Sequence, residues 1–117
     1  TSRMLIKNIL TGAGYEVAVA VDGNDALAKI TAEQFDLVVS DVEMPGMNGF
    51  ELAKAIRARS ETSHLPIVLI TSLSSQEDRQ LGMEAGANAY IVKSEFDNQA
   101  MLEIIANQLD RAARSSI

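Results

Sequence analysis

The sequence predicts an α/β fold, a doubly wound parallel sheet with helices on both of its faces. Short apolar runs alternate with helix-length amphipathic segments along the whole chain, and this alternation is typical of strand-helix-strand units. Polar residues directly follow three of the apolar runs, as expected where parallel strands end at the ligand-binding edge of an open sheet. The length of 117 residues and the hydrophobic content of 47% fit one domain over residues 1–117.

The first part of the chain predicts two helices and two strands. Residues 4–10 carry a helical stripe of apolar side chains, so we expect a helix that ends near residues 12–14. Residues 15–21 form an apolar run that predicts a strand, and a second helical stripe covers residues 26–30. The next apolar run, residues 35–40, predicts another strand.

Capping residues locate two helices in the rest of the chain. Asn48 with Glu51 reads as a cap that opens a helix over residues 49–58. Ser74 with Glu77 reads as the cap of a largely polar helix that ends at residue 85. The remaining predicted elements are strands over residues 66–70 and 89–92 and a helix over residues 98–113.

Three successive predicted strands end in an acid, a hydroxyl and a cation, which are Asp41, Thr71 and Lys93. Taken singly, each has another interpretation: an acid that begins a turn, a strand-end cap, and a lysine that extends its stem over apolar residues. Together they suit phosphoryl transfer to a carboxylate. Asp41 would attack phosphorus, while Lys93 and Thr71 would bind the phosphoryl oxygens as charge builds on them.

The motifs around these residues resemble the response-regulator receiver domain along nearly the whole chain. By this resemblance Asp41 is the phosphoacceptor, Thr71 the switch hydroxyl, Tyr90 the switch aromatic and Lys93 the phosphate-binding lysine. The backbone carbonyl of Glu43 would join Asp41 as a ligand of Mg²⁺. The motifs are Ser-Asp-Val-Glu-Met-Pro-Gly-Met-Asn-Gly-Phe-Glu-Leu at 40–52, Ile-Thr-Ser at 70–72 and Ala-Gly-Ala-Asn-Ala-Tyr-Ile-Val-Lys at 85–93.

The resemblance implies a flavodoxin-like receiver fold and a signalling role in a two-component phosphorelay. A histidine kinase or phosphotransfer domain would supply the phosphoryl group, since His64 is the only histidine and lies in a polar loop. The domain would be no enzyme beyond slow self-dephosphorylation. Phosphate on Asp41 would draw Thr71 inward and let Tyr90 turn toward the core. This movement would change which output partner the domain prefers. The sequence does not identify that partner.

The sequence of residues 39–45 and 90–97 most resembles receivers fused to the C-terminal end of chemotaxis-type hybrid histidine kinases. Ser94 stands where most receivers have a proline after the lysine. A cis bond before a residue other than proline costs roughly 3 kcal/mol, so we expect the Lys93–Ser94 bond to be trans.

One departure concerns the first strand of the family, which carries an adjacent acidic pair for Mg²⁺. This chain starts with residues that look like the helix after that strand, so we expect Mg²⁺ binding to be weak or absent. By resemblance the sheet order is 2-1-3-4-5 with the central strand missing. We expect residues 15–21 and 35–40 to pair directly, or a second copy to exchange or pair strands with this one.

Composition excludes several other classes of function. The chain has no cysteine, so disulfides and thiolate metal sites are excluded, which suits the cytoplasm. The net charge of -6 disfavours nucleic-acid binding, because phosphate contacts require clustered Lys and Arg. No apolar run approaches the roughly 20 residues that span a bilayer, so no membrane association is expected.

A haloacid-dehalogenase-like phosphohydrolase is the alternative function. Asp41 would then be the nucleophile and Glu43 the general acid, since such enzymes also use a hydroxyl and a lysine at later strand ends. Their nucleophile lies near the chain start and is followed by Gly-Thr, whereas Met44-Pro45-Gly46 follow here. Multiple turnover of a generic phosphomonoester would distinguish the two functions.

Overall fold

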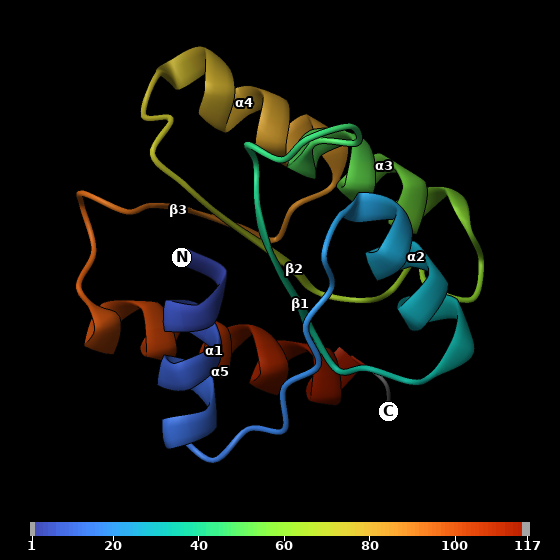
Figure 1. Ribbon diagram of the computed structural model, residues 1–117, viewed down its shortest axis with the longest axis horizontal. Coiled ribbons are helices and arrows are strands. Elements are labelled where there is room, and N and C mark those ends of the chain that lie inside the picture. The colour runs from blue at the N-terminus through green and yellow to red at the C-terminus, as the bar shows by residue number, and fades with distance from the viewer. Residues whose placement is uncertain (1, 116–117) are drawn as a thin grey trace.

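The computed structural model describes residues 2–115, which form a parallel sheet flanked by helices on both faces (Figure 1). The sheet of these residues has the strand order β1-β2-β3. The expected α/β class is therefore confirmed. The elements are α1 (Ser2–Gly12), α2 (Gly23–Ala32), β1 (Val38–Asp41), α3 (Gly49–Ala58), β2 (Ile67–Thr71), α4 (Gln76–Ala85), β3 (Ala89–Val92) and α5 (Asn98–Ser115).

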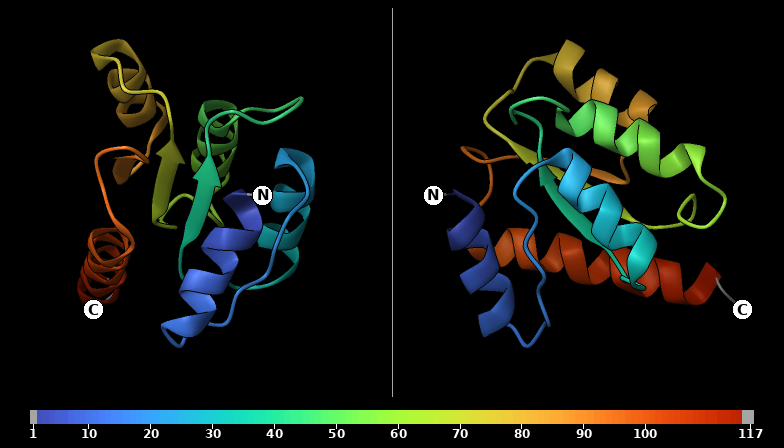
Figure 2. Two further views of the ribbon diagram at one scale, coloured as in Figure 1. Left: turned by 60° about the vertical axis from the view of Figure 1, so that its left-hand side comes forward. Right: turned by 45° about the vertical axis from the view of Figure 1, so that its right-hand side comes forward.

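Alternate residues of the central strand β2 build the two halves of the core. Ile67 and Leu69 pack with the cluster formed by α2, α3 and α4, whereas Val68 and Ile70 pack with the cluster formed by α1 and α5. Figures 1 and 2 show these two groups of helices on opposite sides of the sheet. Every residue of β2 is buried, as expected for a strand covered on both faces.

The predicted strand over residues 15–21 is wrong, because this segment joins no sheet. Its carbonyl groups accept hydrogen bonds from helix side chains instead of from a strand. The Arg3 guanidinium donates to Ala20 and Val21 at 3.3 and 3.2 Å, and Lys29 Nζ donates to Val19 at 3.1 Å. An apolar run becomes a strand only when a neighbouring strand completes its backbone hydrogen bonds.

The predicted strand over residues 35–40 is shorter and later, since β1 covers Val38–Asp41. Its pairing is with β2 alone, in a register that sets Val38 opposite Ile67 and Asp41 opposite Ile70. The expected direct pairing with residues 15–21 does not occur within residues 2–115. One edge of β1 therefore has no strand beside it in the described part of the chain, and Val38 and Val39 are only half-buried.

Side-chain caps begin α3 and α4. The expected capping box is confirmed: Asn48 Oδ1 accepts from the Glu51 N–H at 2.9 Å, and Glu51 Oε1 accepts from the Asn48 N–H at 3.0 Å. The cap of α4 is Ser75, not Ser74, and its hydroxyl accepts from the Asp78 N–H at 3.0 Å. A serine followed three residues later by an acid occurs in both registers, so the pattern alone did not distinguish them.

The last helix, α5, extends to Ser115, two residues beyond the predicted end. Met101 and Ile105 are its buried residues in the core against β2 and β3. No helix among residues 2–115 combines the length and apolar character needed to cross a membrane.

Arg57 joins three segments around the end of α3. Its guanidinium donates to the carbonyls of Ser63 and Leu65, to the carbonyl of Gly86, and to Asn88 Oδ1. Burial lowers the pKa of this guanidinium below its ordinary value. A planar fork that serves several acceptors cannot be replaced by a single ammonium.

We therefore expect Arg57→Lys to lower the free energy of unfolding by about 1.5 to 3 kcal/mol, the range for hydrogen bonds to charged groups. Urea unfolding measures this loss. The matched control is Arg59→Lys at an exposed position one half-turn away, where a change within about 0.5 kcal/mol is expected. Equal effects at the two positions would contradict the bridging role of Arg57.

Candidate functional site

The ends of three adjacent parallel strands bring Asp41, Thr71 and Lys93 to the same edge of the sheet. Asp41 is the last residue of β1 and lies opposite Ile70, one residue before Thr71. Lys93 directly follows β3, and its N–H donates to the Thr71 carbonyl at 2.8 Å. The sheet thus assembles the acid, hydroxyl and cation that the sequence pattern placed at strand ends.

Asp41 makes two contacts that fix its carboxylate. One oxygen lies 2.9 Å from Lys93 Nζ, and the other accepts from the Glu43 N–H at 3.1 Å. The side chains of Lys93 and Asp41 are 35% and 29% exposed. Solvent therefore reaches the pair, so it contributes little to stability while it remains accessible to a reacting group.

Gly49 holds the backbone of Asp41 against the start of α3. Its N–H donates to the Val42 carbonyl at 2.9 Å. A Cβ at position 49 would lie 2.5 Å from the Asp41 carbonyl oxygen and 2.8 Å from Val42 Cα. Only glycine fits this approach of two backbones. Sequence reasoning missed this role, although the signal was a glycine directly after the helix cap.

Thr71 and Tyr90 are linked through the backbone of one residue. Thr71 is buried and its hydroxyl oxygen accepts from the Leu73 N–H at 3.2 Å, while the Tyr90 hydroxyl donates to the Leu73 carbonyl at 2.9 Å. Burial raises the pKa of the Tyr90 phenol above its ordinary value, and the Asp78 carboxylate adds to this rise. The Tyr90 side chain is half-buried.

The described residues do not form a complete Mg²⁺ site. No group of three or more His, Cys, Asp or Glu side chains within residues 2–115 is arranged to hold a metal ion. The Lys93 ammonium occupies one oxygen of Asp41, and the Glu43 carboxylate accepts from the Ser72 hydroxyl at 2.9 Å. Mg²⁺ requires about six oxygen ligands in octahedral geometry, so one carboxylate and the Glu43 carbonyl are too few.

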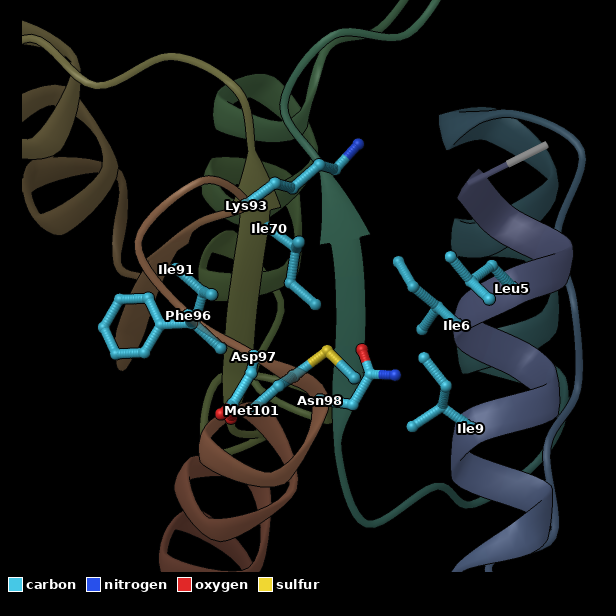
Figure 3. Close-up of a pocket in the computed structure, with 10 residues that line it drawn as sticks. All are labelled: Leu5, Ile6, Ile9, Ile70, Ile91, Lys93, Phe96, Asp97, Asn98 and Met101. Atoms are coloured by element: carbon cyan, nitrogen blue, oxygen red, sulfur yellow. The ribbon is translucent and has the colours of Figure 1, made fainter.

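An apolar pocket of about 180 Å³ lies beside this site (Figure 3). Leu5, Ile6 and Ile9 of α1 line it on one side, opposite Ile91 of β3 and Met101 of α5. The polar residues of its lining are Lys93, Asp97 and Asn98, so the pocket borders the Asp41–Lys93 pair through Lys93.

Residues 1–108 match the model of the response regulator receiver domain. Among individual relatives, the chemotaxis protein CheY of Pseudomonas aeruginosa is 37% identical over 112 residues, which are 95% of this chain and 90% of that protein. This match covers nearly the full length of both proteins.

Two other relatives are larger proteins or parts of them. The gliding motility regulatory protein of Myxococcus xanthus is 35% identical over 88% of this chain, but the chain spans only 13% of that relative's length. The receiver domain of a sensor histidine kinase from Pseudomonas aeruginosa has a TM-score of 0.84 at 26% identity, with 93% of this chain and 88% of that chain covered. That solved structure has a magnesium ion coordinated in its active-site cleft.

Proposed function

The chain belongs to the response regulator receiver domain family, and we propose that it takes a phosphoryl group from a phosphohistidine onto Asp41. Receiver domains are phosphoacceptor signalling modules of two-component systems and are not classical enzymes. The contact of 2.9 Å between Asp41 and Lys93 at the carboxyl edge of the sheet carries the proposal. The comparisons give no support to the alternative, a haloacid-dehalogenase-like phosphohydrolase.

The transfer itself is a displacement at phosphorus. A carboxylate oxygen of Asp41 forms the new bond to phosphorus, and the bond between phosphorus and the histidine nitrogen of the donor breaks. The donor is a histidine kinase or a phosphotransfer domain. Lys93 exchanges its contact with the carboxylate for one with a phosphoryl oxygen, which places a positive charge where negative charge accumulates.

Thr71 and Tyr90 are proposed to read out the phosphorylated state. The Thr71 hydroxyl gives up its contact with the Leu73 N–H and donates to a phosphoryl oxygen. The Tyr90 hydroxyl donates to the carbonyl of the same residue, Leu73. A change at Thr71 thus reaches the ring through the backbone of Leu73, and the ring communicates it to an output partner.

Replacement of Lys93 by alanine tests whether the Asp41–Lys93 ion pair serves the stability of the fold or the acceptance of a phosphoryl group. We expect Lys93→Ala to lower the free energy of unfolding by less than about 1 kcal/mol, because the pair is solvent-exposed. The rate of phosphoryl acceptance should fall by about 10²- to 10³-fold, the usual effect of losing one preorganised donor. Phosphotransfer kinetics and urea unfolding of the same variant measure both quantities. An unchanged transfer rate would contradict the role of Lys93.

We also propose that residues 1–117 form one receiver domain within a larger histidine kinase chain, with slow self-dephosphorylation. The resemblance of residues 39–45 and 90–97 to the receivers of chemotaxis-type hybrid kinases supports this. The relative from Myxococcus xanthus, of which the chain spans 13%, supports only a place within a longer protein.

The open edge of β1 supports a strand-exchanged or strand-paired homodimer of the 117-residue chain. Within the described residues β1 has a partner on one side only, and its valines are half-buried. Edges with unpaired backbone groups recruit strands from other chains. The first strand of the family, with its acidic pair, would occupy the same edge and complete the Mg²⁺ site.

For the 117-residue chain we therefore expect concentration-dependent dimerisation and weak Mg²⁺ binding. Sedimentation velocity over a range of concentrations and titration with Mg²⁺ measure the two properties. The physical reasons are the unpaired edge of β1 and the single carboxylate available to the metal. A monomer at all concentrations that binds Mg²⁺ tightly would contradict both expectations.

A further inference from the structure

Gly82 lies on the face of α4 that covers β3, directly against the ring of Tyr90. It is buried, and Tyr90 lies opposite Leu69 in the register of the sheet. A Cβ at position 82 would lie 2.7 Å from Tyr90 Cδ2 and 3.1 Å from Cε2. Real Cβ atoms do not approach ring carbons so closely, so the observed ring position requires glycine here.

The ring is the group that would have to move. The next atom near such a Cβ is Leu69 Cδ1 at 3.5 Å, which is an ordinary van der Waals contact. No backbone atom is among the three nearest neighbours. The Tyr90 ring can rotate about its side-chain bonds into another staggered position, whereas the backbone of a strand has no such freedom.

Nothing in helix formation requires a glycine at this place. Gly82 lies in the interior of α4, where glycine destabilises a helix relative to alanine. Its backbone has no left-handed conformation, since the positive φ angles among the described glycines occur at Gly14, Gly46 and Gly86. The space for the Tyr90 ring is therefore the physical reason for glycine at position 82.

We propose that Gly82 is a positioning residue that leaves room for the Tyr90 ring in its inward position against α4. The hydroxyl of the inward ring donates to the Leu73 carbonyl at 2.9 Å, and Thr71 contacts the N–H of the same residue. This proposal rests on the proposed function only in treating Tyr90 as the switch aromatic.

The first test is titration of the Tyr90 phenol by its tyrosinate absorbance. The Tyr15→Phe change leaves Tyr90 as the only tyrosine of the chain. In this background Gly82→Ala is expected to shift the titration midpoint downward, because the ring leaves its buried position. The control is Gly12→Ala, also in a helix, where a Cβ meets nothing within 4 Å and the midpoint should not move. An unchanged midpoint in Gly82→Ala would overturn the proposal.

The second test compares melting temperatures and does not require that Gly82→Ala fold well. Gly82→Ala should lower the Tm when Tyr90 is present and raise it in a Tyr90→Ala background, where only the better helix propensity remains. An equal decrease in both backgrounds, or a double variant that fails to fold, would overturn the proposal. Neither readout involves phosphoryl transfer, so failure of Asp41 as acceptor would leave both results interpretable.

Discussion

Asp41→Asn is expected to abolish labelling of the chain by a phosphohistidine donor. Asparagine keeps the shape of the side chain and can still accept from the Glu43 N–H. It lacks the anionic oxygen that attacks phosphorus, and it loses the charge that pairs with Lys93. Transfer of radioactive phosphate from a phosphorylated histidine kinase or phosphotransfer domain measures the loss, in a chain that also carries the family's first strand with its acidic pair and with donor and Mg²⁺ in excess.

The matched control for this variant is Asp36→Asn. Asp36 is exposed and precedes β1, at the opposite end of the strand from Asp41. Both variants lose one negative charge, so a general electrostatic effect on donor encounter would reduce labelling in both. We expect Asp36→Asn to retain the labelling of the unchanged chain. Equal labelling in the two variants would remove Asp41 from the proposed function.

Gly49→Ala is expected to lower the free energy of unfolding, because the added methyl group clashes with the backbone at Asp41 and Val42. The added Cβ would lie 2.5 Å from the Asp41 carbonyl oxygen and 2.8 Å from Val42 Cα, and neither backbone atom can rotate away. Overpacking of this kind costs about 1 to 3 kcal/mol or more. The gain from a better helix former is at most about 1 kcal/mol, so the clash should prevail.

Phosphoryl acceptance should fall with this loss of stability, because the clash displaces the backbone that carries the Asp41 carboxylate. Chemical unfolding and phosphotransfer kinetics of the Gly49→Ala variant measure the two effects. Gly12→Ala serves as control, since a Cβ there meets nothing within 4 Å. Stability and transfer rate equal to those of the control would show that the backbone at Asp41 tolerates a Cβ at position 49, which contradicts the prediction.

Most features that follow from short stretches of sequence were predicted correctly, although the cap of α4 is Ser75 and not Ser74. Asn48 and Glu51 are three residues apart, and the capping box that they form is confirmed. Asp41, Thr71 and Lys93 each follow an apolar run, and parallel strands necessarily bring such ends to one edge. The Lys93–Ser94 bond is trans, as the cost of a cis bond before serine predicts.

The features that depend on distant neighbours could not be read from the sequence. Residues 15–21 have the apolar pattern of a strand, but the pattern does not state whether another strand lies beside them. The clash that requires glycine at position 82 involves Tyr90 on another element. The acceptors of Arg57 likewise lie up to 31 residues away along the chain. Tertiary contacts of this kind set conformations that local pattern leaves open.

Mapping of the phosphorylated residue tests the central claim most directly. After transfer from a phosphohistidine donor, the chain is digested and the phosphopeptides are identified by mass spectrometry, with and without hydroxylamine, which cleaves acyl phosphates. We predict one hydroxylamine-labile phosphopeptide, and it contains Asp41. A stable phosphate on Thr71, or a phosphate on His64 or on any peptide that lacks Asp41, would contradict the account.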